Sequence, residues 1–177
     1  VEDEPLGTAG SIKRIQEYLN ETFIVVSGDA LTDFDLSKAL EFHRAKKADV
    51  TLVLTRVPNP LEFGVVVTTP EGRIERFLEK PSWGEVVSDT INTGIYILEP
   101  HVLERMEARR AYDFSTDLFP EMLADKARLF GYVADGYWCD IGNLEQYRQA
   151  QLDMLQGRVG FAPPGKCIGE GIWVGAG

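Results

Sequence analysis

The chain has 177 residues, of which 44% are hydrophobic and 26% charged, so it fits one globular domain with a short appendage. Its formal net charge of −10 argues against a nucleic-acid polymer as a partner, because such binding depends on clustered lysines and arginines. No apolar run approaches the ~20 residues of a membrane span, so we expect no membrane contact. Cys139 and Cys167 form neither a CxxC pair nor a zinc-ligand spacing, so we expect a reduced, cytoplasmic protein.

Helix and strand patterns alternate along most of the chain. The first helix is predicted from Ile12, Ile15 and Leu19, which recur at helical spacing after a possible N-cap at Gly10 or Ser11. In chain order the predicted elements are a helix over 11–19, strands over 22–26 and 49–57 with a helix over 36–47 between them, a hairpin of strands over 64–69 and 73–78, a strand over 93–98, helices over 100–109 and 116–124, a strand over 128–133 and a helix over 144–155.

This alternation, with one hairpin inserted, predicts an α/β domain whose sheet is mixed and mainly parallel. In such sheets ligands bind beyond the carboxyl ends of the strands. Asp29 directly follows the β-branched strand predicted over 22–26. We therefore expect the functional site near Asp29.

The composition changes after Gly157. Gly and Pro fill eight of the 18 positions over 160–177, and Ile168-Gly169 is repeated six residues later by Val174-Gly175. This period is typical of a parallel β-helix, while a disordered Gly-rich tail is the alternative. We divide the chain into an α/β domain over 1–158 and the start of a hexapeptide-repeat β-helix over 159–177.

Six short motifs occur in a particular order along the chain. They are Leu6-Gly7-Thr8-Ala9-Gly10, Ser27-Gly28-Asp29, Glu62-Phe63-Gly64-Val65, Phe77-Leu78-Glu79-Lys80-Pro81, Asn92-Thr93-Gly94-Ile95-Tyr96 and Trp138-Cys139-Asp140-Ile141-Gly142. In this order they resemble the sugar-1-phosphate nucleotidyltransferase family, and most closely its mannose-1-phosphate guanylyltransferases. The resemblance implies a Rossmann-like, three-layer (GT-A-like) fold followed by a left-handed β-helix.

The resemblance also implies the reaction. A sugar 1-phosphate attacks the α-phosphorus of a nucleoside triphosphate and pyrophosphate leaves, so the protein contributes alignment and charge neutralisation. Mg²⁺ takes oxygen ligands, usually one or two carboxylates, and the family pattern assigns that role to Asp29 and Asp140. Two carboxylates that share a metal-free site repel each other, so one pKa should be raised. From spacing alone, each aspartate is better explained as a turn or helix-cap residue, and the ordered resemblance reverses that preference.

The remaining site residues are carried over in the same way. Lys80 is expected to hold the sugar phosphate and act in catalysis with Asp29 and Asp140. Gly64 and Gly94 are expected to let backbone approach the sugar ring, while side chains supply polar contacts. The expected sugar-binding residues are Gly64, Glu79, Asn92, Thr93 and Gly94.

The segment Gly7-Thr8-Ala9 is expected to open a helix whose free N–H groups meet the nucleotide base. A plain helix start explains the same residues. For Glu79-Lys80, a surface ion pair before a turn is the alternative.

The family's GxGxR loop with a later Pro-Lys pair, which holds the triphosphate, has no match in the chain. We interpret the chain as a fragment that lacks the first strands, and expect it to be inactive alone and to aggregate or pair through open sheet edges. The parent is expected to be a homo-oligomer that uses GTP, mannose 1-phosphate and Mg²⁺. Alternatives are adenylyl, uridylyl or thymidylyl transfer to a sugar such as glucose 1-phosphate, or a non-catalytic nucleotide-sugar-binding regulator.

Overall fold

The computed structural model describes residues 4–79, 81–82 and 84–175. Along the chain its elements are α1 (Gly7–Arg14), η1 (Gln16–Tyr18), β1 (Phe23–Val26), β2 (Ala30–Thr32), α2 (Leu36–Lys46), β3 (Val50–Arg56), β4 (Gly64–Thr68), β5 (Ile74–Glu79), β6 (Thr90–Leu98), η2 (Pro100–Arg105), η3 (Phe114–Leu118), α3 (Phe119–Ala124), β7 (Leu129–Val133), β8 (Trp138–Asp140), α4 (Leu144–Leu155), β9 (Lys166–Gly169) and β10 (Ile172–Val174). Here η1 and η2 are 3-10 turns and η3 is a single π turn. None of the helices in these ranges is long and apolar enough to cross a membrane.

Six strands form one mixed sheet in the order β5-β4-β6-β3-β7, with β1 paired to the second half of β6. Only β3 and β7 pair in parallel; every other pair in this sheet is antiparallel. The expectation of a mainly parallel sheet is therefore wrong for the described strands, because β6 runs in the opposite direction between β1 and β3. Since β1, β3 and β7 still point the same way, their carboxyl ends meet at one edge of the sheet.

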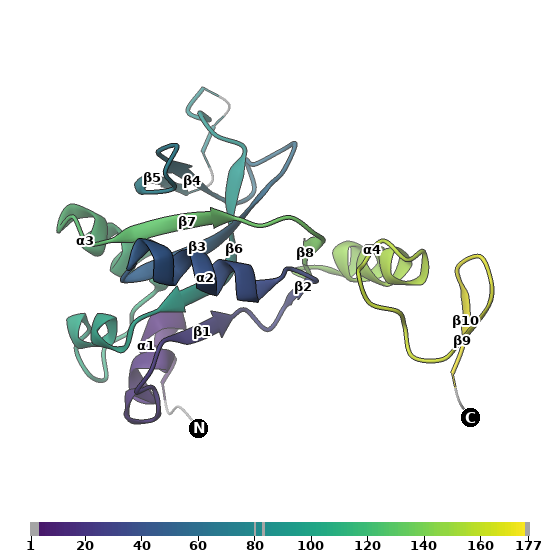
Figure 1. Cartoon of the computed structure of the whole chain (residues 1–177), viewed down its shortest axis with the longest axis horizontal. Coiled ribbons are helices and arrows are strands. Elements are labelled where there is room, and N and C mark those ends of the chain that lie inside the picture. The colour runs from purple at the N-terminus through teal and green to yellow at the C-terminus, as the bar shows by residue number, and fades with distance from the viewer. Residues whose placement is uncertain (1–3, 80, 83, 176–177) are drawn as a thin grey trace.

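Side chains on the two faces of the sheet form two separate cores. Leu52 and Leu54 of β3 pack with Phe114 and Phe119 on one face, whereas Val53 packs with α2 on the other. Figure 1 shows α2 lying along one face of the strands. This alternation within β3 confirms the predicted α/β architecture of helix, sheet and helix layers.

Tertiary contacts move several helix boundaries. The first helix begins at Gly7 rather than at the predicted N-cap, because the amides of Ala9 and Gly10 donate to the carbonyl of Tyr112 (2.9 and 3.1 Å). The helix predicted over 100–109 is the shorter 3-10 turn η2. The helix predicted from 116 starts earlier, at η3, because the Asp113 side chain accepts hydrogen bonds from the amides that follow it.

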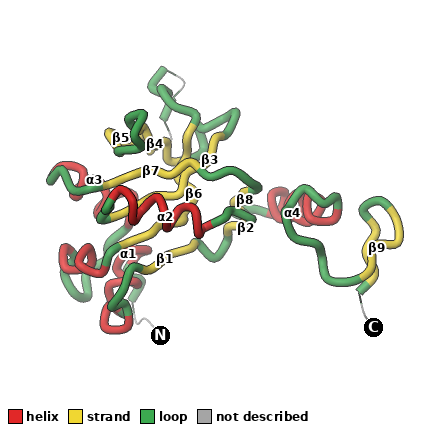
Figure 2. Tube along the Cα trace, viewed as in Figure 1, coloured by secondary structure: helices red, strands yellow, loops and turns green. Residues whose placement is uncertain are grey.

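The carboxyl-terminal part lies apart from the sheet. Figure 1 shows α4 and then the β9–β10 hairpin extending away beyond β8, and Figure 2 shows a loop joining α4 to β9. β9 and β10 pair antiparallel, so the described residues form a hairpin and not the parallel coil of the expected β-helix. The aliphatic residues of the six-residue repeat, Ile168 and Val174, therefore lie on the two strands of one hairpin.

Candidate active site

Two aspartates from distant parts of the sequence meet at the edge where β1 and β7 end. The strand β2 pairs antiparallel with β8, which places Ala30 opposite Asp140. One more backbone hydrogen bond connects the two segments beyond this pair: the amide of Ile141 donates to the carbonyl of Asp29 (2.8 Å). Neither three-residue strand shows an alternating pattern, so sequence reasoning missed the ribbon that brings Asp29 and Asp140 together.

The electrostatics of the two aspartates fit a site for a cation. Burial raises the pKa of Asp140 above its usual value, and the negative charge of Asp29 raises it further. The Ser27 hydroxyl donates to Asp29 Oδ1. No group of three or more His, Cys, Asp or Glu side chains with metal-binding geometry occurs in the described ranges. Two carboxylates fit Mg²⁺, which binds through one or two of them and takes its other ligands from phosphates and water.

The aspartates border an open cleft of about 330 Å³. Its walls come from the ends of β1, β4, β5, β6 and β8, and they include Glu62, Phe63, Gly64, Glu79, Asn92, Thr93, Gly94, Ser115 and Trp138. A second hollow of about 260 Å³ continues from it and shares Gly64, Glu79, Asn92 and Ser115. Residues from five of the six sequence motifs thus meet at one place.

Asn92 is held in a fixed orientation within the cleft. Its Nδ2 donates to the hydroxyls of Tyr96 (3.0 Å) and Ser115 (3.1 Å), and its Oδ1 accepts from the amide of Gly94 (3.1 Å). Both amide hydrogens are therefore used, and one lone pair of Oδ1 remains for a ligand hydroxyl. Burial raises the pKa of Tyr96, whose hydroxyl accepts from Asn92. Ser115 has no motif in the sequence, and only the η3 turn places it here.

The next two residues of the cleft wall are held by contacts within the protein. The Thr93 hydroxyl donates to the carbonyl of Val53 (2.7 Å) and the residue is only 2% exposed, so this hydroxyl faces the core instead of a sugar. Its carbonyl accepts from the Trp138 indole (3.1 Å). Gly94 has φ +75°, and a Cβ there would lie 3.0 Å from the Cβ of Ser27. Gly94 thus approaches closely the residue that bonds Asp29, and its expected contact with a sugar stays a prediction.

Gly64 makes room for a carboxylate. A Cβ at this position would lie 3.2 Å from Oε2 of Glu79, which pairs with Gly64 across the β4–β5 hairpin. Glu79 is exposed at the cleft, consistent with an acceptor for ligand hydroxyls. Lys80, the expected phosphate-binding residue, lies outside the described residues.

The segment Gly7-Thr8-Ala9 is not part of the described cleft lining. The amide of Ala9 is bonded to Tyr112, and the Thr8 hydroxyl donates to Asp113 (2.7 Å). The expectation of free N–H groups is therefore wrong for Ala9. These contacts instead fasten α1 to the segment that leads into η3.

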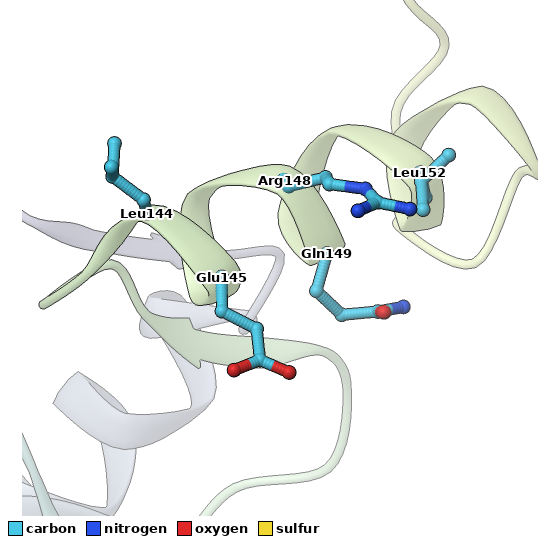
Figure 3. Close-up of a pocket in the computed structure, with 5 residues that line it drawn as sticks. All are labelled: Leu144, Glu145, Arg148, Gln149 and Leu152. Carbon is cyan, nitrogen blue, oxygen red and sulfur yellow. The ribbon is translucent and has the colours of Figure 1, made fainter.

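A larger hollow, of about 480 Å³, runs along α4 and is shown in Figure 3. Leu144 and Glu145 point away from each other there, and Leu144 is 86% exposed. No residue of the six short motifs, the last of which ends at Gly142, lines this hollow. The chemistry therefore places the candidate active site at the carboxylate cleft, although that cleft is smaller.

Comparison with known proteins identifies the family. The sequence pattern of the family described as nucleotidyl transferase matches residues 1–157. The chain belongs to this family. It is 39% identical over 176 residues to a UTP--glucose-1-phosphate uridylyltransferase from Synechocystis sp. and 40% identical over 158 residues to a mannose-1-phosphate guanylyltransferase from Mycobacterium tuberculosis.

These alignments cover 96% and 88% of this chain, which spans less than half of each relative, 45% and 44% respectively. HddC from Yersinia pseudotuberculosis, in a structure complexed with GMP-PN, superimposes with a TM-score of 0.71 over 84% of this chain and 63% of that one, at 27% identity. The nucleotidyltransferase fold expected from the six motifs is confirmed.

Proposed function

We propose that the whole gene product transfers a nucleotidyl group from a nucleoside triphosphate to a sugar 1-phosphate and releases pyrophosphate. The observation that carries this proposal is the register of the β2–β8 ribbon, which places Ala30 opposite Asp140 and so brings two carboxylates to the mouth of a polar cleft. Similarity to the uridylyltransferase and the guanylyltransferase supports the reaction class.

Asp29 and Asp140 are the residues that would hold Mg²⁺, and the ion would neutralise the phosphates and align the α-phosphorus. Glu79 and the free lone pair of Asn92 Oδ1 accept hydrogen bonds from sugar hydroxyls. By family resemblance, Lys80 binds the sugar phosphate, and Gly7, Thr8 and Ala9 lie near the base. Because no covalent intermediate is needed, alignment and charge neutralisation supply the rate enhancement.

Within this class we propose GTP and mannose 1-phosphate as the substrates, on the basis of the LGTAG, FLEKPSWGEV and YWCDIGNLEQY versions of the motifs. The similar identity to a relative named for UTP and glucose 1-phosphate makes that pair the second candidate. We further propose that residues 1–158 form the catalytic domain and that the whole protein is a cytoplasmic homo-oligomer.

The test is pyrophosphate release by the whole gene product with Mg²⁺, using each common ribonucleoside triphosphate and dTTP with mannose or glucose 1-phosphate. We expect release with GTP and mannose 1-phosphate, and a loss of at least about 100-fold in Asp29→Asn or Asp140→Asn. Asp125→Asn is the control, because its ion pair with Arg105 is exposed and remote from the cleft.

Release with UTP and glucose 1-phosphate alone would correct the substrates but keep the reaction. A protein that binds a nucleotide sugar but releases no pyrophosphate with any pair would refute the proposed reaction. That outcome would identify a regulator instead.

A further inference from the structure

The two-stranded ribbon of β2 and β8 carries both candidate metal ligands, yet it is separate from the main sheet. Each strand has three residues, and no third strand joins the ribbon in the described part of the chain. Two-stranded ribbons are marginally stable by themselves. The spacing of Asp29 and Asp140 therefore depends on contacts that hold the ribbon from outside.

Asp33 makes two such contacts at the end of the ribbon opposite the candidate metal ligands. Its Oδ1 accepts from the amide of Tyr137 (2.6 Å), and the amide of Asp33 donates to the Tyr137 carbonyl (3.2 Å). Its Oδ2 accepts from the amide of Gly160 (2.6 Å), which lies beyond α4. One carboxylate thus joins β2, the start of β8 and the segment that follows α4.

Glycines make this junction possible. A Cβ at Gly160 would lie 2.9 Å from Oδ2 of Asp33, and a Cβ at Gly136 would lie 2.5 Å from its Oδ1. Gly136 also has φ +132°, which side-chain-bearing residues rarely adopt. The main chain on both sides can approach the Asp33 carboxylate because neither position has a side chain.

A second carboxylate completes the connection between the ribbon and α4. The Tyr137 hydroxyl donates to Oδ2 of Asp153 (2.8 Å), while Gln149 (2.7 Å) and Arg158 (2.6 Å) donate to its Oδ1. Asp153 is only 7% exposed, although most of α4 is open to solvent. Burying a charge is costly unless it is paired, and the three donors satisfy this carboxylate. Of the three, Tyr137 is the one that joins the ribbon to α4.

We propose that Asp33, Tyr137 and Asp153 are positioning residues that set the spacing of Asp29 and Asp140, an inference that rests on the proposed function. Through them the segment from α4 to Gly160 is coupled to the candidate metal site. The coupling is direct along the chain as well, because α4 begins at Leu144, four residues after Asp140. Displacing this segment moves one ligand of the pair relative to the other.

The test measures metal binding and amide exchange in the whole gene product, besides activity. Asp33→Ala removes the two hydrogen bonds that the Asp33 carboxylate accepts from the amides of Tyr137 and Gly160. Tyr137→Phe is the milder variant, which loses only the hydroxyl that donates to Asp153. The matched control is Thr22→Val, which removes a hydrogen bond to Glu99 (2.7 Å) at the far end of β1. Mn²⁺ affinity is read by electron paramagnetic resonance, stability by thermal unfolding, and the ribbon by hydrogen–deuterium exchange without metal.

We expect the Mn²⁺ dissociation constant to rise about 10-fold or more in Asp33→Ala and Tyr137→Phe, as for other residues that orient metal ligands, and kcat to fall while KM for the sugar phosphate is kept. Exchange should accelerate over 138–141 in these variants but not in Thr22→Val. Unchanged Mn²⁺ affinity in both variants would overturn the inference and leave the proposed function intact. If the wild-type protein binds no Mn²⁺, or if Asp29→Asn binds Mn²⁺ as tightly as the wild type does, both the inference and the proposed function are refuted.

Discussion

Gly94 lies where the end of β1 meets β6, so a single added methyl group tests whether backbone packing sets the geometry around Asp29. At φ +75° an alanine costs about 1–2 kcal/mol in backbone strain. Its Cβ would also lie 3.0 Å from the Ser27 Cβ, a crowding that typically costs about 1 kcal/mol or more. We therefore expect Gly94→Ala to lower the free energy of unfolding by about 2–3 kcal/mol.

For a chain of this size, that loss corresponds to a decrease in Tm of about 5–10 °C, measurable by calorimetry or circular dichroism. Gly28→Ala is the matched control in the same loop: its Cβ would meet no atom within 4 Å. We expect that control to change Tm by less than about 2 °C.

A double variant separates the two contributions. Ser27→Gly removes the crowded Cβ, so adding Gly94→Ala to it should cost only the backbone strain, with a coupling energy of about 1 kcal/mol between the two sites. If Gly94→Ala is as stable as Gly28→Ala, the left-handed backbone and the close contact with Ser27 are both wrong.

Three further predictions concern the cleft and its support. Thr93→Val should destabilise the fold by about 1 kcal/mol, because the Thr93 hydroxyl donates to a main-chain carbonyl of β3. The same variant should leave KM for the sugar phosphate unchanged. A roughly 10-fold increase in KM would mean that the hydroxyl contacts substrate. Burial alone would raise the pKa of Asp113, but hydrogen bonds, first from Thr8, outweigh it and hold the pKa below its usual value. Asp113 therefore contributes stability above its unfolded pKa of 3.8, and this stability is lost as pH falls through the lower folded pKa. We expect Asp113→Ala to lower the free energy of unfolding by about 1–2 kcal/mol at pH 7 but by much less at pH 2. Denaturant unfolding at both pH values measures the difference. Without metal, Asp29→Asn should lower the pKa of Asp140 toward 3.8 in an NMR titration, since one of the two causes that raise it is removed; an unmoved titration would place the carboxylates too far apart to share a cation.

The sequence by itself determined the class of fold and predicted where the chemistry takes place. The β-branched and alternating segments that became β1 and β3 were predicted because burying apolar side chains dictates their period locally. The six motifs identified the family and pointed to the residues around the cleft, and the repulsion predicted for paired carboxylates agrees with the raised pKa of Asp140.

Strand direction, short strands and the orientation of polar side chains were decided only by the tertiary structure. A strand's period is the same whichever way its neighbour runs, so the reversed β6 could not be predicted from alternation. The three-residue strands β2 and β8 are too short to show any period, although they bring Asp29 to Asp140. Likewise, Thr93 faces the core and Ser115 faces the cleft because of hydrogen bonds to residues 40 and 23 positions away, and such long-range partners leave no mark on the local sequence.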